Sequence, residues 1–229
     1  MSKFKLAFGI HNHQPVGNFE SVFEQAHQQA YLPFLELVHK HKNFRMSLHQ
    51  SGILWNWQKE NHPEYFKLVC DMVKSGRLEI MTGGFYEPIL PAIPERDMAG
   101  QIELLTKYID KNFDTTPKGL WLTERVWEPH LPEILSKCGI HYVPVDDAHF
   151  IYAGFDKSQL TGPFVTESNG HALILLPIQQ RLRYLIPFGT IDDLFTELKQ
   201  QAKINPGGLA VYADDGEKFG VWPETYKHC

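Results

Sequence analysis

Short apolar runs recur along the chain at fairly even intervals. They are nearly continuous in hydrophobicity rather than alternating with polar residues, which is typical of strands that are covered on both faces. Seven such runs predict seven β-strands, over Phe4–Ile10, Phe44–Leu48, Leu78–Met81, Gly119–Leu122, Tyr142–Val145, Ala172–Leu176 and Leu209–Ala213.

Stretches compatible with helices lie between most of these runs. They cover Val22–Lys40, His62–Lys74, Glu95–Asn112, Pro132–Cys138 and Ile191–Gln201. The last of them has the clearest start, because Thr190 can cap it and two aspartates follow at the positive end of the helix. Alternation of strand and helix predicts an α/β fold with parallel strands and right-handed crossovers.

Reactive side chains gather after the predicted strands rather than before them. In chain order they are His11 and His13, His49, Glu79 within the third run and Glu87 after it, Glu124, Asp146 and Asp147, Arg181 and Arg183, and finally Asp214 and Asp215. Clustering at the carboxyl ends of strands is typical of a barrel active site. A doubly wound sheet would gather ligands at one switch point, and the chain has no G-x-G-x-x-G or P-loop motif. We therefore expect a barrel.

Composition narrows the function classes. The 229 residues fit one domain over 1–229, and the net charge of −5 gives no electrostatic footprint for nucleic acid. The cysteines, Cys70, Cys138 and Cys229, are odd in number and widely spaced, which argues against a disulfide framework or a zinc cluster. Neither a signal-peptide core nor a membrane-spanning run is visible, so we expect a cytoplasmic protein without a membrane partner.

Two of the strand ends carry the acidic groups that glycosidic bond cleavage requires, one nucleophile and one proton donor. Glu124 follows Trp121-Leu-Thr, and Asp214-Asp215-Gly216-Glu217 follows the last apolar run. The alternatives are a structural ion pair between Glu124 and Arg125 and a solvated acidic turn at Asp-Gly. Bulky rings beside both segments favour the catalytic interpretation, because low-dielectric surroundings are used to tune acid–base groups; they are Trp121, Trp127, Phe219 and Trp222.

His11 and His13 lie at i and i+2, on the same side of an extended segment. That spacing suits a metal pair, with His49, Asp146 or Asp147 as a third ligand, or two donors to the hydroxyls of a sugar. We favour the second role and expect no metal and no cofactor. Glu79 is a candidate support or sugar ligand, and Arg183 a candidate for holding carboxylates ionised and for binding substrate.

At these residues the chain resembles glycoside hydrolase family 57, above all its 4-α-glucanotransferases and α-amylase-type members. The resemblance is carried by Phe8–Pro15, Gly76–Ile80, Gly84–Pro88, Trp121–Pro129, Leu182–Phe188 and Asp214–Pro223, which together span nearly the whole chain. It implies an incomplete seven-stranded (β/α)7 TIM-like barrel, with Glu124 as nucleophile and Asp215 as acid/base. It further implies substrate-site roles for His11, His13, Glu79, Trp121, Glu217 and Trp222.

The sequence thus predicts a retaining enzyme that acts on an α-1,4-glucan or maltooligosaccharide through a covalent glycosyl-enzyme. One rival is a metal-dependent hydrolase of the polysaccharide deacetylase type, built on His11, His13 and a strand-end aspartate. Another is a carbohydrate-binding barrel without chemistry. In the family, a helical region follows the barrel and covers the cleft. With the sequence ending at Cys229, we expect a chain that folds, handles glucan poorly and self-associates through uncovered apolar surface.

Overall fold

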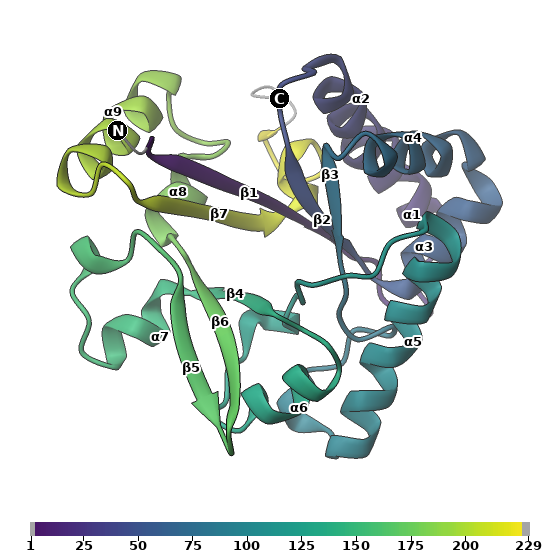
Figure 1. Ribbon diagram of the computed structural model, residues 1–229. Helices are drawn as coiled ribbons and strands as arrows, with labels where there is room; N and C mark the ends of the chain where they lie inside the picture. Colours follow the sequence, from purple (N-terminus) through teal and green to yellow (C-terminus); the bar gives the residue numbers. More distant parts are fainter. Residues whose placement is uncertain (1–2, 226–229) are drawn as a thin grey trace.

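The structure is a computed structural model that describes residues 3–225 (Figure 1). The strands are β1 (Lys5–Asn12), β2 (Met46–Gln50), β3 (Leu78–Met81), β4 (Tyr142–Asp146), β5 (Phe164–Ser168), β6 (His171–Ile178) and β7 (Leu209–Asp215). The helices are α1 (Glu20–Ala26), α2 (Leu32–Lys40), α3 (Gly52–Asn61), α4 (Pro63–Lys74), α5 (Glu95–Phe113), α6 (Leu131–Lys137), α7 (Asp147–Tyr152), α8 (Gln180–Leu185) and α9 (Ile191–Ile204). Three shorter segments matter below: the π-helical η1 (His27–Tyr31) and the 3₁₀ turns η3 (Thr123–Arg125) and η5 (Gly216–Phe219).

The strands form two sheets, which are joined to each other at both ends in a curved arrangement. One sheet has the order β3-β2-β1-β7, with parallel pairing throughout, and the other has the order β4-β6-β5. Residues 119–121 connect them, since Trp121 N–H donates to the Thr82 carbonyl at 2.8 Å and Leu120 N–H donates to the Tyr142 carbonyl at 3.1 Å. At the other end β6 meets β7, where Gln179 N–H donates to the Val211 carbonyl at 3.0 Å. The predicted α/β barrel is confirmed.

The predicted fourth strand is reduced to two isolated parallel bridges, Thr82 with Leu120 and Gly119 with Tyr142. A side chain at Gly119 would collide with the Tyr142 ring, so the glycine allows the two segments to approach closely. The sequence analysis omitted β5, which runs antiparallel to β6. Its signal was present in the chain: Asn169-Gly170, both with positive φ (50° and 79°), form the two-residue hairpin turn that this dipeptide favours.

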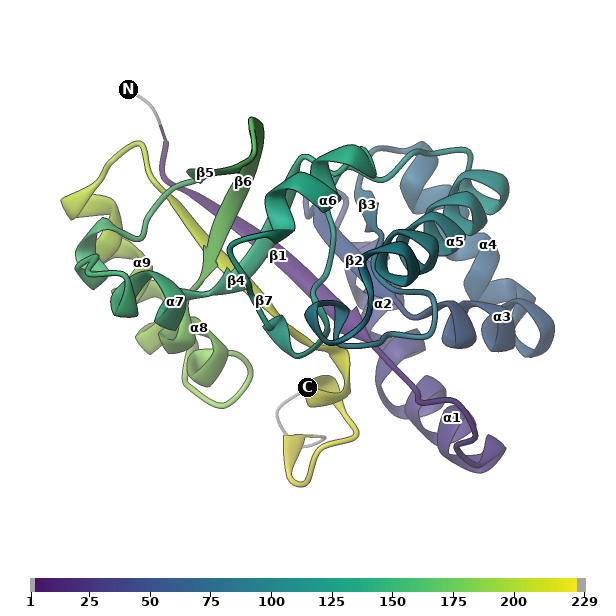
Figure 2. The ribbon, with the colours of Figure 1, turned by 90° about the horizontal axis from the view of Figure 1, so that it is seen from below.

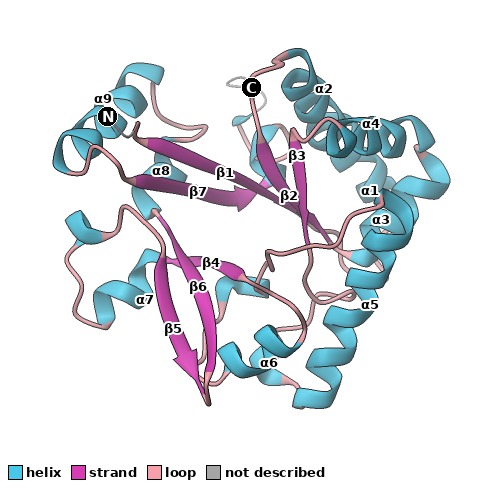
Figure 3. Cartoon of the chain, in the orientation of Figure 1, coloured by secondary structure: helices cyan, strands magenta, loops and turns pink. Residues whose placement is uncertain are grey.

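The predicted helices are present, with two differences. The expected Val22–Lys40 helix is interrupted by the π-helical turn η1, and α3, α7 and α8 were not predicted. The expected cap of α9 is present, because the Thr190 side chain accepts a hydrogen bond from Asp193 N–H at 3.1 Å. Figures 2 and 3 show α1–α5 beside the β1–β3 side of the barrel and α7–α9 at the opposite side.

The core lies in three places. The largest cluster fills the space between β1, β2, β3 and the helices beside them, and a second one packs α5 and α6 against β4 and β6. The interior of the barrel holds a small cluster of buried residues, Met81, Trp121, Ile178, Val211 and Ala213. Side chains along each strand point alternately into the barrel and out of it. On β1, Gly9 faces the interior, so His11, two residues later, also faces the interior. Among residues 3–225 no helix has both the length and the apolar character needed to cross a membrane.

Candidate active site

Strand register gathers the first group of site residues. His11 lies opposite His49 in the pairing of β1 with β2 and opposite Asp215 in the pairing of β1 with β7. The Trp121 ring stacks on the His11 ring, with centroids 4.6 Å apart and an angle of 15° between the planes. These side chains come from three adjacent parallel strands and one bridging segment. They therefore lie at one level of the barrel mouth.

A buried carboxylate, Glu87, organises the histidines. Its two oxygens contact His11 Nε2 at 2.8 Å and His13 Nδ1 at 2.5 Å, and His11 Nδ1 lies 2.8 Å from His49 Nδ1. Burial opposes a charge on His11, but the Glu87 carboxylate prevails and raises the pKa of His11. Burial and the neighbouring His11 lower the pKa of His49 to about 3. The raised pKa of His11 favours its imidazolium form, in which both ring nitrogens donate and the neutral His49 accepts.

Replacing Glu87 by glutamine tests this ion pair. His11 has a raised pKa, so its contribution to stability is complete below its ordinary pKa of 6.5 and is lost as the pH rises through the raised value. Glu87 has a lowered pKa despite its burial, because of His11, so its contribution is present above 4.5 and is lost in acid. We expect Glu87→Gln to reduce the free energy of unfolding by about 3–5 kcal/mol near pH 6 and by less near pH 9.

Urea unfolding at the two pH values measures this difference. Glu103→Gln is the matched control, because Glu103 pairs with Lys107 on the exposed surface of α5 and exposed pairs contribute little. A loss for Glu87→Gln that is equal at both pH values would contradict the assignment of charge to His11.

Asp214 lies at the centre of a second charged group. Its side chain is fully buried and accepts from Lys218 Nζ, from Arg183 Nη2 at 3.1 Å and from Asp215 N–H at 3.1 Å. Although burial opposes it, the contact with Asp214 raises the pKa of Arg183. Asp214 therefore fixes the backbone that carries Asp215, while its own carboxylate is occupied.

Lys218→Met should destabilise the fold, because it leaves the Asp214 carboxylate buried with one cation fewer. Removing one partner of a buried ion pair costs about 3–5 kcal/mol. Lys107→Met, on the solvated face of α5, is the control and should change little. Thermal and urea unfolding measure both, and unchanged stability of Lys218→Met would show that the buried contact does not support the fold.

Two arginines contact carboxylates at the ends of different strands. Arg125 Nε contacts Asp146 Oδ1 at 3.1 Å, and Arg183 Nη1 contacts the same oxygen at 3.5 Å. Arg125 Nη1 also lies 4.0 Å from Asp215 Oδ1, and its guanidinium carbon lies 5.7 Å from the centre of the Trp121 ring. Arg125 thus connects the segment after Trp121 to the end of β7.

Glu124 lies on the tight turn η3, and its side chain is exposed at the mouth of the barrel. Both Glu124 and Arg125 have a φ of 54°, the left-handed region that non-glycine residues rarely adopt. Two successive residues in this region store strain, which proteins tolerate mainly where it positions a functional group. The turn gives Glu124 and Arg125 different directions, with Arg125 half-buried against Asp146 and Glu124 open to solvent.

Glu217 follows on η5. Its carboxylate accepts hydrogen bonds from the Tyr31 hydroxyl and from His13 N–H, the latter at 3.2 Å. Burial raises the pKa of Glu217, although the hydrogen bond from Tyr31 opposes the shift. Trp222 is 40% exposed, and its ring centre lies 5.0 Å from Lys218 Nζ. These residues form the side of the site nearest the end of β7.

The structure brings together most of the residues that the sequence singled out. Side-chain contacts and strand register connect His11, His13, Trp121, Glu124 through its neighbour Arg125, Arg183, Asp215, Glu217 and Trp222. Glu79 is the exception. It precedes Met81, the β3 partner of His49, by two residues, and it contacts Ser47 Oγ at 3.1 Å and the Tyr142 hydroxyl, one layer closer to the amino-terminal end.

Sequence reasoning did not assign several side chains that the structure places in this group. Glu87, Arg125, Asp146 and Asp214 were visible as strand-end residues, but nothing in the sequence ranked them above their neighbours. Tyr31 had no signal, because it lies on a helical segment far from any strand end.

The structure does not arrange the histidines and aspartates as the metal hypothesis expected. His11, His49 and Glu87 each offer a ligand atom within 4.8 Å of the others, but both ring nitrogens of His11 already make hydrogen bonds inside this group. The two aspartates considered as third ligands are also occupied. Asp146 pairs with Arg125 and Arg183, and Asp147 accepts from Gln180 N–H at 3.1 Å.

Carboxylates and histidines gathered at the carboxyl ends of barrel strands have the arrangement of a barrel active site. The chain belongs to glycosyl hydrolase family 57, since the sequence model of that family matches residues 7–228. It is 48% identical to "Alpha-amylase 1" of Dictyoglomus thermophilum over 97% of its own length and 32% of that relative's.

Solved structures agree. The crystal structure of a 4-alpha-glucanotransferase from Thermococcus litoralis superposes with a TM-score of 0.96 at 46% identity, over 99% of this chain and 36% of that one. A structure of the polysaccharide deacetylase type from Mycobacterium smegmatis superposes with a TM-score of 0.62 at 14% identity, over 94% of this chain and 77% of that one, which shows a shared fold alone. The chain spans about a third of the length of the amylase and glucanotransferase relatives.

Proposed function

We propose that this chain is the catalytic barrel of a retaining enzyme that acts on α-glucans, of the α-amylase or 4-α-glucanotransferase type. The observation that carries the proposal is the position of Arg125. It is adjacent to Glu124 in the chain and lies 4.0 Å from the Asp215 carboxylate, so one guanidinium connects the segments that carry the two proposed catalytic acids. The names of the relatives support the substrate class.

The proposed reaction has two steps. The Glu124 carboxylate attacks the anomeric carbon, and the electron pair of the glycosidic bond passes to the departing oxygen, which takes a proton from Asp215. In the second step Asp215 removes a proton from water or from a sugar hydroxyl, whose oxygen displaces Glu124. Water gives hydrolysis and a sugar gives transfer. A retaining mechanism requires the two carboxyl groups to lie about 5–6 Å apart.

The surrounding residues have binding roles in this proposal. His13 donates to a sugar hydroxyl from its second ring nitrogen, Nε2, since only Nδ1 contacts Glu87. His11, the other predicted donor, has both ring nitrogens engaged by Glu87 and His49, so in this proposal it contributes a charge at the site and holds Glu87 in place. Trp121, the other predicted aromatic binder, is only 3% exposed and supports the site by stacking on His11, while Trp222 contributes a 40% exposed ring at the outer edge. Arg183 and Glu217 bind and orient polar groups. A role for Glu79 requires the substrate to reach the layer below His49, which makes it the weakest member of the predicted set.

Incubation with maltooligosaccharides tests the proposal, with the sizes of the products followed over time. Longer and shorter chains together mean transfer, and glucose with short products alone means hydrolysis. Covalent labelling by an activated fluoro-sugar separates an enzyme from the alternative of a carbohydrate-binding barrel without chemistry. A folded chain that binds maltooligosaccharides, forms no products and takes up no label would overturn the proposal.

Chelation is expected to leave turnover unchanged, because no step above uses a metal. The measurement is activity before and after prolonged dialysis against EDTA, at a temperature well below unfolding. Loss of activity that is restored by added zinc would favour the deacetylase-type rival, in which a metal-bound water replaces Glu124 as nucleophile.

Two further expectations accompany the proposal. We expect action in the cytoplasm on an α-1,4-glucan or maltooligosaccharide, without nucleic acid or membrane partners.

We also expect self-association of the 229-residue chain. Apolar side chains on α9 and the loop before it are exposed, among them Ile191 (72%) and Phe195 (53%), and helix α9 buries no residue completely. Light scattering measures the assembly.

A further inference from the structure

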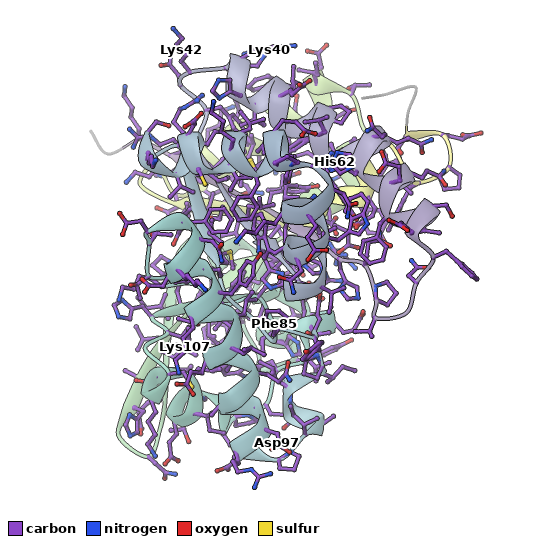
Figure 4. All side chains as sticks on the ribbon, turned by 90° about the vertical axis from the view of Figure 1, so that its right-hand side faces the viewer. Lys40, Lys42, His62, Phe85, Asp97 and Lys107 are labelled. Carbon is purple, nitrogen blue, oxygen red and sulfur yellow. The ribbon has the colours of Figure 1, made fainter. Side chains whose placement is uncertain are left out.

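Tyr31 contacts Glu217 but has no role in the reaction or in the substrate binding proposed above. It is the last residue of the π-helical turn η1, between α1 and α2, and its side chain is only 2% exposed. These two helices lie on the face of the molecule seen in Figure 4, where Lys40 marks the end of α2. A buried tyrosine outside the barrel strands therefore touches a residue of the candidate active site.

The path of the backbone brings η1 and η5 together. A hydrogen bond from Leu32 N–H to the carbonyl five residues earlier closes η1 as a π turn, a conformation that is rare overall but recurs at functional sites. Gly220, the residue after η5, has a φ of 152°, and a side chain there would collide with the Gln29 carbonyl of η1. The glycine thus allows the two turns to pack closely, which holds Tyr31 beside Glu217.

The Tyr31 hydroxyl is held by a chain of side-chain amides. Gln14 Nε2 donates to the hydroxyl oxygen at 2.9 Å, and Gln14 Oε1 accepts from Asn18 Nδ2, also at 2.9 Å. The hydroxyl donates its single proton to the Glu217 carboxylate, since the other acceptor, the His13 carbonyl, is 3.4 Å away. Burial, together with the charge of Glu217, raises the pKa of Tyr31, so the hydroxyl remains a donor at neutral pH.

Glu217 uses one of its two carboxylate oxygens for these contacts. Oε1 accepts from the Tyr31 hydroxyl and, at 3.2 Å, from His13 N–H. Within residues 3–225, no other residue donates a hydrogen bond to Oε2, and the side chain is partly exposed. Two donors to one oxygen restrict the rotation of the carboxylate and leave the second oxygen able to accept from a ligand.

We propose that Tyr31 is a positioning residue, which holds Oε1 of Glu217 so that Oε2 accepts from one hydroxyl of a bound glucan unit. The inference rests on the proposed function, because that function supplies the sugar. Tyr31 is buried and acts only through the carboxylate of Glu217. Such an arrangement strengthens binding because the acceptor is oriented before the substrate arrives.

Tyr31 also favours the ionised form of Glu217. Burial raises the pKa of Glu217, and the hydrogen bond from Tyr31 on η1 and the charge of His11 at the end of β1 oppose the rise. These two are the titratable side chains of neighbouring elements that act on the carboxyl group. A carboxylate is a stronger acceptor for a hydroxyl than a carboxylic acid is. Removing the Tyr31 hydroxyl should therefore raise the pKa of Glu217 further and weaken the binding of sugar.

Tyr31→Phe tests the inference, because it removes the hydroxyl and keeps the ring. Tyr65→Phe is the matched control, since Tyr65 is also fully buried and donates to Gln50 Oε1 at 2.8 Å without contacting Glu217. Chains with isotope-labelled glutamate carboxyl groups are titrated by NMR, and Glu217→Gln identifies the Glu217 signal. We expect the midpoint of this titration to move to higher pH in Tyr31→Phe and to stay at the parent value in Tyr65→Phe.

Affinity for a maltooligosaccharide is measured by calorimetry in a Glu124→Gln background, where turnover does not consume the ligand. We expect Tyr31→Phe to weaken binding by about 10-fold, as loss of a hydrogen bond to a charged group predicts. Added to Glu217→Gln, the same change should cause no further loss, because the tyrosine acts only through that carboxylate. Tyr65→Phe should bind like the parent.

The inference fails if the Glu217 midpoint is unchanged in folded Tyr31→Phe, or if Tyr31→Phe weakens binding equally with and without Glu217. Circular dichroism shows whether each variant folds. Gln14→Met, which removes the amide behind the hydroxyl, should move the midpoint in the same direction by less, and it replaces Tyr31→Phe if that variant does not fold. A parent chain that binds no maltooligosaccharide would overturn the proposed function, whereas the NMR titration needs no ligand and still decides whether Tyr31 controls Glu217.

Discussion

Replacing Glu124 by glutamine is expected to lower turnover of maltooligosaccharides by at least about 10³-fold while leaving the fold intact. The amide has the volume of the carboxylate but cannot attack the anomeric carbon. The side chain is exposed, so the change leaves no buried group without a partner. Steady-state kinetics and thermal unfolding of the same preparations measure the two parts of this prediction.

Glu128→Gln is the matched control, because Glu128 is an exposed carboxylate on the same segment four residues later. An activated fluoro-sugar should label the parent chain and Glu128→Gln but not Glu124→Gln. Near-normal turnover by well-folded Glu124→Gln protein, or equal labelling of all three chains, would refute Glu124 as the nucleophile.

Much of the barrel could be predicted because hydrophobic runs and strand ends are local features. Six of the seven runs, those at β1, β2, β3, β4, β6 and β7, matched observed strands to within two residues at either end. Adjacent parallel strands share one direction, so a histidine near the end of β1 and an aspartate at the end of β7 lie at the same edge of the sheet. In the pairing of β1 with β7, His11 does lie opposite Asp215.

What escaped prediction depends on contacts between distant segments. The 119–122 run is as apolar as the other runs, but it pairs with its neighbours through only two bridges, one of which requires the close approach of Gly119 to Tyr142. Glu79 follows the residue pattern of a sugar ligand, yet its depth in the barrel is set by the register of β3 with β2. Tyr31 reaches Glu217 only because η1 packs beside η5. No local pattern encodes these distances.

The strain at Glu124 and Arg125 was equally invisible. Thr-Glu-Arg contains no glycine or asparagine, the residues that signal a left-handed turn, yet two of its residues have positive φ. Compensation comes from elsewhere in the fold, since Arg125 is held by Asp146 on β4 and lies over the Trp121 ring. A functional turn whose cost is offset by tertiary contacts is where reasoning from local propensity is expected to fail.

The two adjacent aspartates of β7 have different surroundings. Asp214 is fully buried and held by Lys218 and Arg183, so its oxygens are occupied. The Asp215 side chain is 29% exposed, lies in the layer of His11 and is 4.0 Å from Arg125 Nη1. Of the pair, Asp215 is therefore the one able to exchange a proton with substrate, which supports the assignment that the family resemblance implied.

Asp215→Asn is accordingly expected to lower turnover of natural glucans by about 10³-fold or more, because a sugar leaving group requires a proton. Formation of the covalent intermediate from an α-glucosyl fluoride should be affected far less, since fluoride departs without protonation. Asp214→Asn is the contrasting variant: it should reduce stability, and any loss of activity should be similar on both substrates. The measurement is the ratio of kcat/KM for maltooligosaccharide to that for the fluoride in each variant. Equal losses on the two substrates in folded Asp215→Asn would contradict its role as general acid, because an acid catalyst is needed only where the leaving group must be protonated.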